Sequence, residues 1–176
     1  MSATAEALRL NLGCSKTRVP GFLNFDINPA KDVDLVGDIR DLSQFADGSV
    51  ADLLASNVLE HISHTQTLAC LKEWRRVLAS GGKLWLSVPD FDAVIRLYKY
   101  EGLNEYLKNL IWGEQDSQFG YHYICFTWPN LRLQLDQAGF KDAKRVKFLP
   151  FGLADASALH DNIENKPTAI NVEVTA

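Results

Sequence analysis

The order of apolar segments along the first half of the chain is the feature that most constrains its fold. Short apolar runs at residues 8–12, 22–27 and 33–36 each end at a glycine or an acidic residue, as buried strands do before a turn. Two further runs, at residues 50–55 and 83–88, lie on either side of a segment with helical spacing. Strands that alternate with a helix in this way predict an α/β sheet.

The helix predicted over residues 65–79 is the best-marked element. One buried helical face is indicated by five regularly spaced apolar residues: Leu68, Leu71, Trp74, Val77 and Leu78. Ser63 and Gln66 form a capping-box pattern before this helix, and Gly81 and Gly82 are expected to end it.

The second half of the chain predicts one more helix and two more strands. The helix runs over residues 129–138, with Gly139 as its C-terminal cap and Phe140 as the apolar contact beyond. A strand at residues 143–149 follows, and the alternating pattern from Ile170 predicts a final strand antiparallel to it. The sheet is therefore expected to be mostly parallel, with an antiparallel last strand.

Length and composition favour one ordinary globular domain over residues 1–176. The net charge of -4 and the isoelectric point near 5.5 argue against nucleic acid as a partner. The three cysteines include no CxxC pair, which favours a reducing, cytoplasmic location. We expect no membrane span and no export signal, because the chain has neither an 18-residue apolar run nor a basic leader.

Residues 91–128 are expected to cover a substrate. This segment predicts a helix capped by Asp90, a break at Gly102, a second helix to Trp112, and then the polar and aromatic stretch GEQDSQFGYHY. At the carboxyl edge of a parallel sheet, such an insertion lies where ligands bind. The alternative interpretation is a helical hairpin that simply packs on the sheet.

Polar residues and a glycine end successive strands, so they are expected along one edge of the sheet: Gly13, Asp26, Asp38, Asn57 and Asp90. Gly13 permits a close backbone approach, and Asp26 offers a carboxylate to both hydroxyls of a ribose. Asp38 and the adjacent Ile39 suit an adenine amino group beside an apolar wall, while Asn57 faces the other end of the ligand. Taken singly, an acidic residue in such a place is more often a cap or a turn former.

The first connections are unusually short. GCSKTR has one glycine where a dinucleotide fingerprint needs GxGxxG, and residues 14–21 are too few for a helical crossover, which argues against a nicotinamide-dependent oxidoreductase. Residues 28–32 are also too few for a helix. One helical layer is therefore expected to be thin, leaving an apolar face suited to a homodimer.

These residues resemble the class I S-adenosylmethionine-dependent methyltransferases, and within them the small bacterial group called methyltransferase type 11. The resemblance covers residues 8 to about 149 in four blocks: LNLGCSKTRVPGFLNFDI, VGDIRDLSQFADGSVADLLASNVLEHI, LKEWRRVLASGGKLWLSVPD and LRLQLDQAGF. It implies a Rossmann-like, three-layer α/β fold, the cofactor S-adenosylmethionine and a bacterial transferase. The cofactor contacts that it implies are Gly13 and Cys14 at the methionine part, Asp26 and Ile27 near the ribose, Asp38 and Ile39 at the adenine, and Asn57 and Val58 closing the pocket.

The acceptor is expected to be a small molecule or a saccharide unit. SNVLEH replaces the Pro-Pro-aromatic signature of many amino-group methylases, so an oxygen acceptor is slightly preferred. His122, between two tyrosines in the expected cover, is the candidate base, and Asp90 either contacts the acceptor or caps its helix. His61 is interpreted as a packed or cap-bonded histidine. No metal site is expected, because no two histidines share a helix face with a carboxylate at ligand spacing.

A second hypothesis assigns the chain to a different class of protein. The reduced glycine loop and the missing helices would also suit a non-catalytic module that senses S-adenosylmethionine or supports a partner enzyme.

Overall fold

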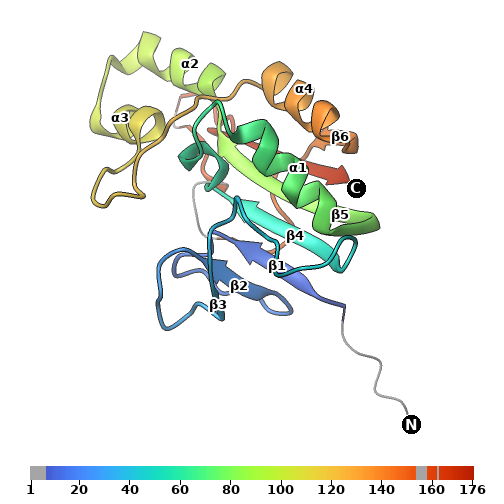
Figure 1. The fold of residues 1–176 in the computed structure, drawn as a ribbon. Helices are drawn as coiled ribbons and strands as arrows, with labels where there is room; N and C mark the ends of the chain where they lie inside the picture. The colour runs from blue at the N-terminus through green and yellow to red at the C-terminus, as the bar shows by residue number, and fades with distance from the viewer. Residues whose placement is uncertain (1–6, 154–157, 162) are drawn as a thin grey trace.

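A seven-stranded sheet organises the molecule, as the computed structural model shows for residues 7–153, 158–161 and 163–176 (Figure 1). The strands, in the order β3-β2-β1-β4-β5-β7-β6, are β1 (Arg9–Leu12), β2 (Leu23–Asp26), β3 (Leu35–Val36), β4 (Val50–Ser56), β5 (Leu78–Pro89), β6 (Lys141–Arg145) and β7 (Ala169–Thr175). Strands β1 to β5 pair in parallel, while β7 is antiparallel to both β5 and β6. The predicted α/β sheet with an antiparallel last strand is confirmed.

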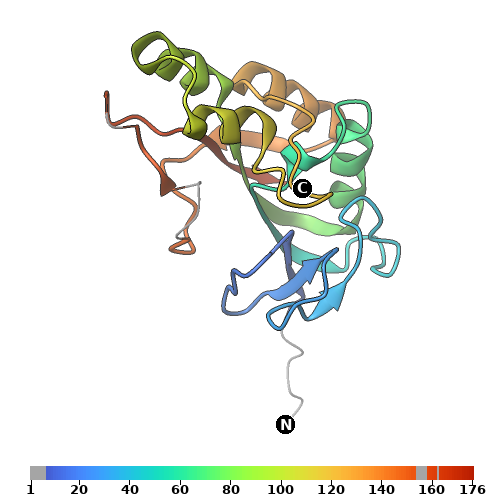
Figure 2. The same ribbon diagram turned by 90° about the vertical axis from the view of Figure 1, so that its left-hand side faces the viewer.

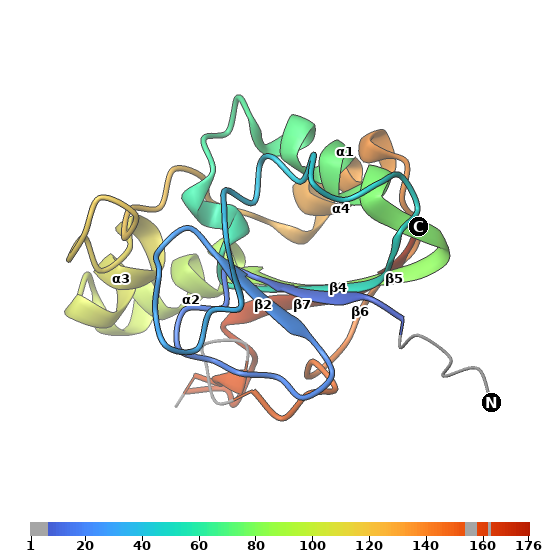
Figure 3. The same cartoon turned by 60° about the horizontal axis from the view of Figure 1, so that its bottom comes forward.

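The helices lie in two groups. Helices α1 (Thr67–Val77) and α4 (Trp128–Ala138) pack side by side on one face of the sheet (Figures 1 and 3). Helices α2 (Phe91–Glu101) and α3 (Glu105–Trp112) pack on each other beyond the end of β5 (Figure 2). A 3-10 turn, η1 (Leu59–His61), follows β4.

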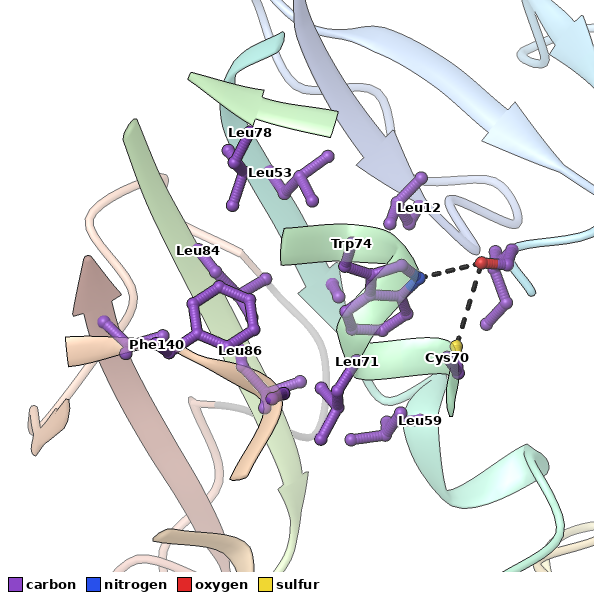
Figure 4. Close-up of a cluster of buried hydrophobic side chains, with 14 of the residues drawn as sticks. Leu12, Leu53, Leu59, Cys70, Leu71, Trp74, Leu78, Leu84, Leu86 and Phe140 are labelled. Atoms are coloured by element: carbon purple, nitrogen blue, oxygen red, sulfur yellow. Dashed lines mark hydrogen bonds between the residues drawn. The ribbon is translucent and has the colours of Figure 1, made fainter. Parts of the chain in front are cut away.

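The main core fills the space between the sheet and helices α1 and α4 (Figure 4). Trp74, at the centre of the predicted apolar stripe, is fully buried. Its Nε1 donates a hydrogen bond to the carbonyl oxygen of Ile39 at 2.8 Å, so the helix also fixes the loop after β3. This bond satisfies two buried polar groups at once, which makes the loop a rigid neighbour of the core.

Loops cover the opposite face of the sheet. Val19 and Phe22, from the short β1–β2 connection, pack with Leu149 around Leu54 of β4. The orange-red segment between β6 and β7 runs over this side, and Phe151 packs against the same group of side chains (Figure 3). Because the connections after β1 and β2 are too short for helices, this layer is thin, as the sequence predicts.

The predicted start and end of α1 are wrong. Gly81 and Gly82 lie inside β5, because the chain passes directly from Val77 at the end of the helix into the strand. The side chain of Ser63 does not cap the helix; instead its carbonyl oxygen accepts hydrogen bonds from the backbone N–H and the hydroxyl of Thr67, both at 3.0 Å. β6 is also shorter than predicted, since Leu149 leaves the sheet for the loop layer.

The other predicted helix ends are confirmed. Asp90 caps α2 by accepting a hydrogen bond from the N–H of Asp92 at 3.0 Å, and Gly102 separates α2 from α3. Gly139 ends α4 in the left-handed conformation.

Candidate functional site

A cavity of about 760 Å³ opens where β1, β2 and β4 end, at the edge of the sheet that Figure 2 faces. The loops after these strands and after β3 form one side, and Glu114, residues 116–120 and Tyr123 form the other. Seven of the eight predicted cofactor residues line it: Gly13, Asp26, Ile27, Asp38, Ile39, Asn57 and Val58. Residues that end four different strands therefore meet in one space, as the sequence predicts.

Cys14 does not line this cavity. Its side chain is buried, with Sγ 3.8 Å from the carbonyl oxygen of Ser15. Burial, together with the carboxylate of Asp26, raises the pKa of the thiol to about 11, so it stays protonated and is a poor nucleophile.

Gly13 brings the backbone after β1 close to the side chain of Val58, and both residues line the cavity. Its N–H donates to the carbonyl oxygen of Phe25 at 2.8 Å, and its φ is +63°, in the left-handed region. A Cβ atom here would lie 2.2 Å from Cγ2 of Val58, a separation that no side chain tolerates. The position therefore requires glycine both for its backbone conformation and for space.

Asp26 presents a held carboxylate at the end of β2. Its Oδ2 accepts the N–H of Ser15 at 2.9 Å, and its Oδ1 accepts the N–H of Asn28 at 2.8 Å. Each oxygen keeps a second lone pair, and the side chain is among those lining the cavity. The two backbone bonds orient the carboxylate, so that it can accept hydrogen bonds from a vicinal diol.

Asp38 and Ile39 form the third part of the wall. The guanidinium and the backbone N–H of Arg40 bind the carboxylate of Asp38 and hold its pKa below the usual range. Ile39 is buried, and its carbonyl oxygen is bound to Trp74 of the core. An apolar side chain beside a fixed carboxylate suits the face and the amino group of an adenine.

Asn57 lies at the other end of the cavity, directly after β4. Its φ is +52°, a left-handed conformation that asparagine tolerates better than most residues, and its N–H donates to the carbonyl oxygen of Ser87. Its buried Oδ1 has no hydrogen-bond partner among the residues that the structure describes. A buried acceptor of this kind is suited to a ligand donor such as an ammonium group.

The two candidate catalytic residues lie outside the cavity lining. Asp90 caps α2 and accepts a hydrogen bond from Arg145 at 3.2 Å, and burial raises the pKa of its carboxyl group in spite of that partner. His122 packs behind His61, with the two rings edge to face and their centroids 4.8 Å apart. Burial, followed by the neighbouring His61, lowers the pKa of His122 to about 4.

His61 and Tyr123 are site residues that the sequence interpretation missed, since both line the cavity. His61 does not cap a helix: its Nδ1 contacts the carbonyl oxygen of Tyr121 at 3.0 Å, across the chain from η1 to the loop after α3. The N–H of Tyr123 donates to the carbonyl oxygen of Glu60 at 2.8 Å. The only sequence signal was the position of His61 directly after a strand end, in SNVLEH.

Comparisons with known proteins agree with this geometry. Residues 16–86 match the family model of a methyltransferase domain. Among curated proteins none matches the chain. No helix in the described ranges has both the length and the apolar character needed to span a bilayer.

Solved structures with the same fold are numerous. A SAM-dependent methyltransferase from Archaeoglobus fulgidus has 14% sequence identity and a TM-score of 0.63, over 97% of this chain and 86% of that one. A SAM-dependent methyltransferase of Thermotoga maritima, described as a possible histamine N-methyltransferase, has 18% identity and a TM-score of 0.61, over 96% and 81%. A methyltransferase of Haloferax volcanii, described in complex with the activator Trm112, has 15% identity and a TM-score of 0.56, over 97% and 83%.

Proposed function

We propose that this chain is a class I S-adenosylmethionine-dependent methyltransferase and that it methylates a hydroxyl oxygen of a small molecule or a saccharide unit. The methyltransferase-domain match and the shared fold support the proposal. The observation that carries the proposal is the single cavity in which Gly13, Asp26 and Asn57 face residues 114–120. One side of this space fits a nucleoside cofactor, and the other leaves room for an acceptor.

The residues of the cavity fit the cofactor from end to end. Gly13 and the unpartnered Oδ1 of Asn57 suit the methionine part, whose ammonium group would occupy that acceptor. Asp26 would bind the ribose hydroxyls, and Asp38 with Ile39 the adenine. Ile27 and Val58 would line the same pocket. Cys14 is buried beside the cavity and would make no contact with the cofactor.

S-adenosylmethionine, when bound, supplies an electrophilic methyl group. The chain then has to hold the acceptor oxygen in line with that methyl, exclude water and take up the hydroxyl proton. We assign these three tasks to the end of the cavity where His61 lies and where His122 packs against its ring. Burial lowers the pKa of both rings, so both are neutral at pH 7 and able to act as bases.

The segment 91–128 has the role of acceptor cover in this proposal. Glu114 and residues 116–120 of this segment line the cavity directly. Asp90 contributes as the helix cap and the partner of Arg145, and we give it no contact with the acceptor. Four expectations from the sequence stay predictions: a homodimer, the exclusion of nucleic acid, a bacterial origin and a cytoplasmic location.

The proposal is tested by calorimetric titration with S-adenosylmethionine, S-adenosylhomocysteine and NAD in parallel, followed by an acceptor screen. We expect binding of the first two alone, and formation of S-adenosylhomocysteine with hydroxylated small molecules or saccharides. The screen includes amines, because the Thermotoga structure is described as a possible N-methyltransferase. Transfer to amines alone would contradict the oxygen acceptor. Binding without turnover of any acceptor would favour the cofactor-sensing module instead.

A further inference from the structure

Three metal-ligating side chains meet at the acceptor end of the cavity. Glu60, His61 and His122 each offer one ligand atom, and these atoms all lie within 4.8 Å of one another. Glu60 is buried, the two histidines are half-buried, and His61 also lines the cavity. His122 lies 61 positions after His61 and 62 after Glu60 in the sequence, so only the fold brings the three together.

Backbone carbonyl groups hold both rings in place. Nδ1 of His61 lies 3.0 Å from the carbonyl oxygen of Tyr121, and Nδ1 of His122 lies 3.1 Å from that of Leu110. The backbone of Phe119 also bonds to the His61 ring. A carbonyl oxygen can only accept, so the neutral His122 ring carries its proton on Nδ1 and keeps a lone pair on Nε2. Metal-binding histidines in proteins are oriented in this way, by donating their second N–H to a backbone carbonyl.

The backbone fixes the cluster as well. Tyr123 and Glu60 are joined by the N–H to carbonyl bond between the loop and η1, and the N–H of His122 donates to the carbonyl oxygen of Trp112 at 3.1 Å. The loop that carries His122 is thus held against the turn that carries the other two residues. Such a supported arrangement needs little rearrangement on binding an ion.

We propose that Glu60, His61 and His122 bind a divalent transition-metal ion, with Zn²⁺ as the best fit. Two imidazole nitrogens and one carboxylate, with at least one coordination position left open, are the ligand set of catalytic zinc sites. Bonds of about 2.0–2.1 Å would draw the ligand atoms to about 3.4 Å apart in tetrahedral geometry. Because the ligand atoms already lie within 4.8 Å of one another, the ion would draw each pair together by about 1.4 Å or less, since tetrahedral bonds set them about 3.4 Å apart.

The role of the ion rests on the proposed function. Because His61 lines the cavity, the open position of the ion faces the space left for the acceptor. An acceptor hydroxyl bound there would have a lowered pKa and lose its proton to water, so with the ion bound the two histidines act as its ligands and no longer as bases. Its oxygen then forms the bond to the methyl carbon while the carbon–sulfur bond breaks, and the electron pair goes to sulfur, giving S-adenosylhomocysteine. The ion is neither oxidised nor reduced.

Metal binding can be measured without any methyl transfer. The full-length protein is treated with a chelator and titrated with Zn²⁺ by calorimetry, and Co²⁺ loading is followed by its visible absorption. We expect one ion per chain, and His122→Ala or Glu60→Gln to weaken Zn²⁺ binding by about a hundredfold or more, since each removes a ligand. His64→Ala is the matched control, because His64 is exposed, lies three residues from His61 and is outside the cluster.

Equal Zn²⁺ affinity in the wild type, His122→Ala and His64→Ala would overturn the site. If His122→Ala fails to fold, the visible spectrum of the wild-type protein with Co²⁺ tests the site. An ion held by the proposed ligands should absorb strongly, whereas the weak absorption of six-coordinate Co²⁺ in water would contradict the site. Failure of the proposed function is distinguishable: a protein that binds Zn²⁺ but transfers no methyl group keeps the metal site and loses the function. Full transfer after complete metal removal would keep the function and overturn the role of the ion.

Discussion

At the scale of single residues, the cofactor side of the cavity depends on backbone conformations that few residues adopt. Gly13, Ser15 and Asn57 all have positive φ, and Gly13 and Asn57 end neighbouring strands. Left-handed conformations cost about 1–2 kcal/mol for residues with a Cβ, so they persist only where the surroundings impose them. Here they turn the chain sharply enough for the strand ends to form the floor of the cavity.

Gly13→Ala tests this close approach. We expect cofactor affinity to fall by at least about tenfold, because the new methyl group would displace Val58 from the pocket. Gly102→Ala is the matched control: Gly102 has a similar φ of +68°, but a Cβ there would have no atom within 4 Å. Both variants should lose about 1–3 kcal/mol of stability from the backbone, measured by urea denaturation. Calorimetry with S-adenosylmethionine that shows equal affinity for both would refute the role of Gly13.

Asp26→Ala tests the ribose contact. Its removal should weaken S-adenosylmethionine binding by more than about tenfold, because the ribose hydroxyls lose a charged acceptor and the N–H groups of Ser15 and Asn28 lose their partner. Asp32→Ala is the control, since Asp32 lies in the next connection and does not line the cavity. Unchanged affinity in Asp26→Ala by calorimetry would remove Asp26 from the site.

At the scale of elements, one side chain of α1 ties the loop after β3 to the helix. Glu73 accepts the N–H of Leu42 at 3.0 Å and is bound by the guanidinium of Arg76. Arg76 in turn donates to the carbonyl oxygens of Leu42 and Phe45. The pKa of Glu73 is therefore held below its ordinary value of 4.5, chiefly by Arg76.

This linkage predicts a loss of stability in acid. Because the folded pKa of Glu73 is below 4.5, the unfolded chain takes up a proton first, and stability falls as the pH drops below that value toward the folded pKa. The melting temperature of the wild type should fall between about pH 6 and about pH 3.5, and that of Glu73→Gln should fall less. Glu105→Gln, on the exposed start of α3, serves as the control. Parallel curves for all three proteins would contradict this role of Glu73.

The strands and helices show what the sequence could predict. Apolar periodicity located α1, and the glycine after α4 located its end, because these signals act within one or two turns of the chain. The end of α1 could not be predicted in the same way. Gly81 and Gly82 look like a helix stop, but pairing of Leu78 with Val50 of β4 extends β5 back to that residue, and this long-range contact is absent from the local sequence.

The two sides of the cavity differ in the same way, because only one of them follows from local sequence signals. Its cofactor side follows from strand ends, which meet at one edge in any parallel sheet, so residues such as Asp26 and Asn57 could be predicted. Its acceptor side depends on an irregular loop whose path no local pattern sets. His61 was therefore taken for a packed histidine, and its contact with His122 was not foreseen.

At the scale of the whole molecule, the sheet has two unequal covers. Helices α1 and α4 protect one face, whereas aromatic side chains from loops protect part of the other. Phe151 lies edge to face with Phe22 and Trp85, at centroid distances of 5.1 and 5.6 Å. These few contacts close the β1–β4–β5 part of the sheet on its thin side.

Phe151→Ala should therefore destabilise the whole domain. We expect a loss of about 1–3 kcal/mol in the free energy of unfolding, because a half-buried ring and two aromatic contacts are removed. Phe148→Ala is the matched control, since Phe148 is close in sequence but 47% exposed, and it should cost clearly less. Equal midpoints in urea for both variants would show that the loop layer contributes little.

The anchoring of residues 113–123 has a consequence for how this molecule could acquire new acceptors. The loop is fastened through backbone atoms of Tyr121, His122 and Tyr123 near its end, and the backbone of Phe119 also bonds to His61. Glu114, Asp116, Ser117 and Gln118 line the cavity, and none of the bonds that fasten the loop to η1 uses their side chains. These four side chains can thus be exchanged without releasing the loop. Selectivity and architecture are separable in this fold, and a library restricted to those four positions would vary the first while leaving the second intact.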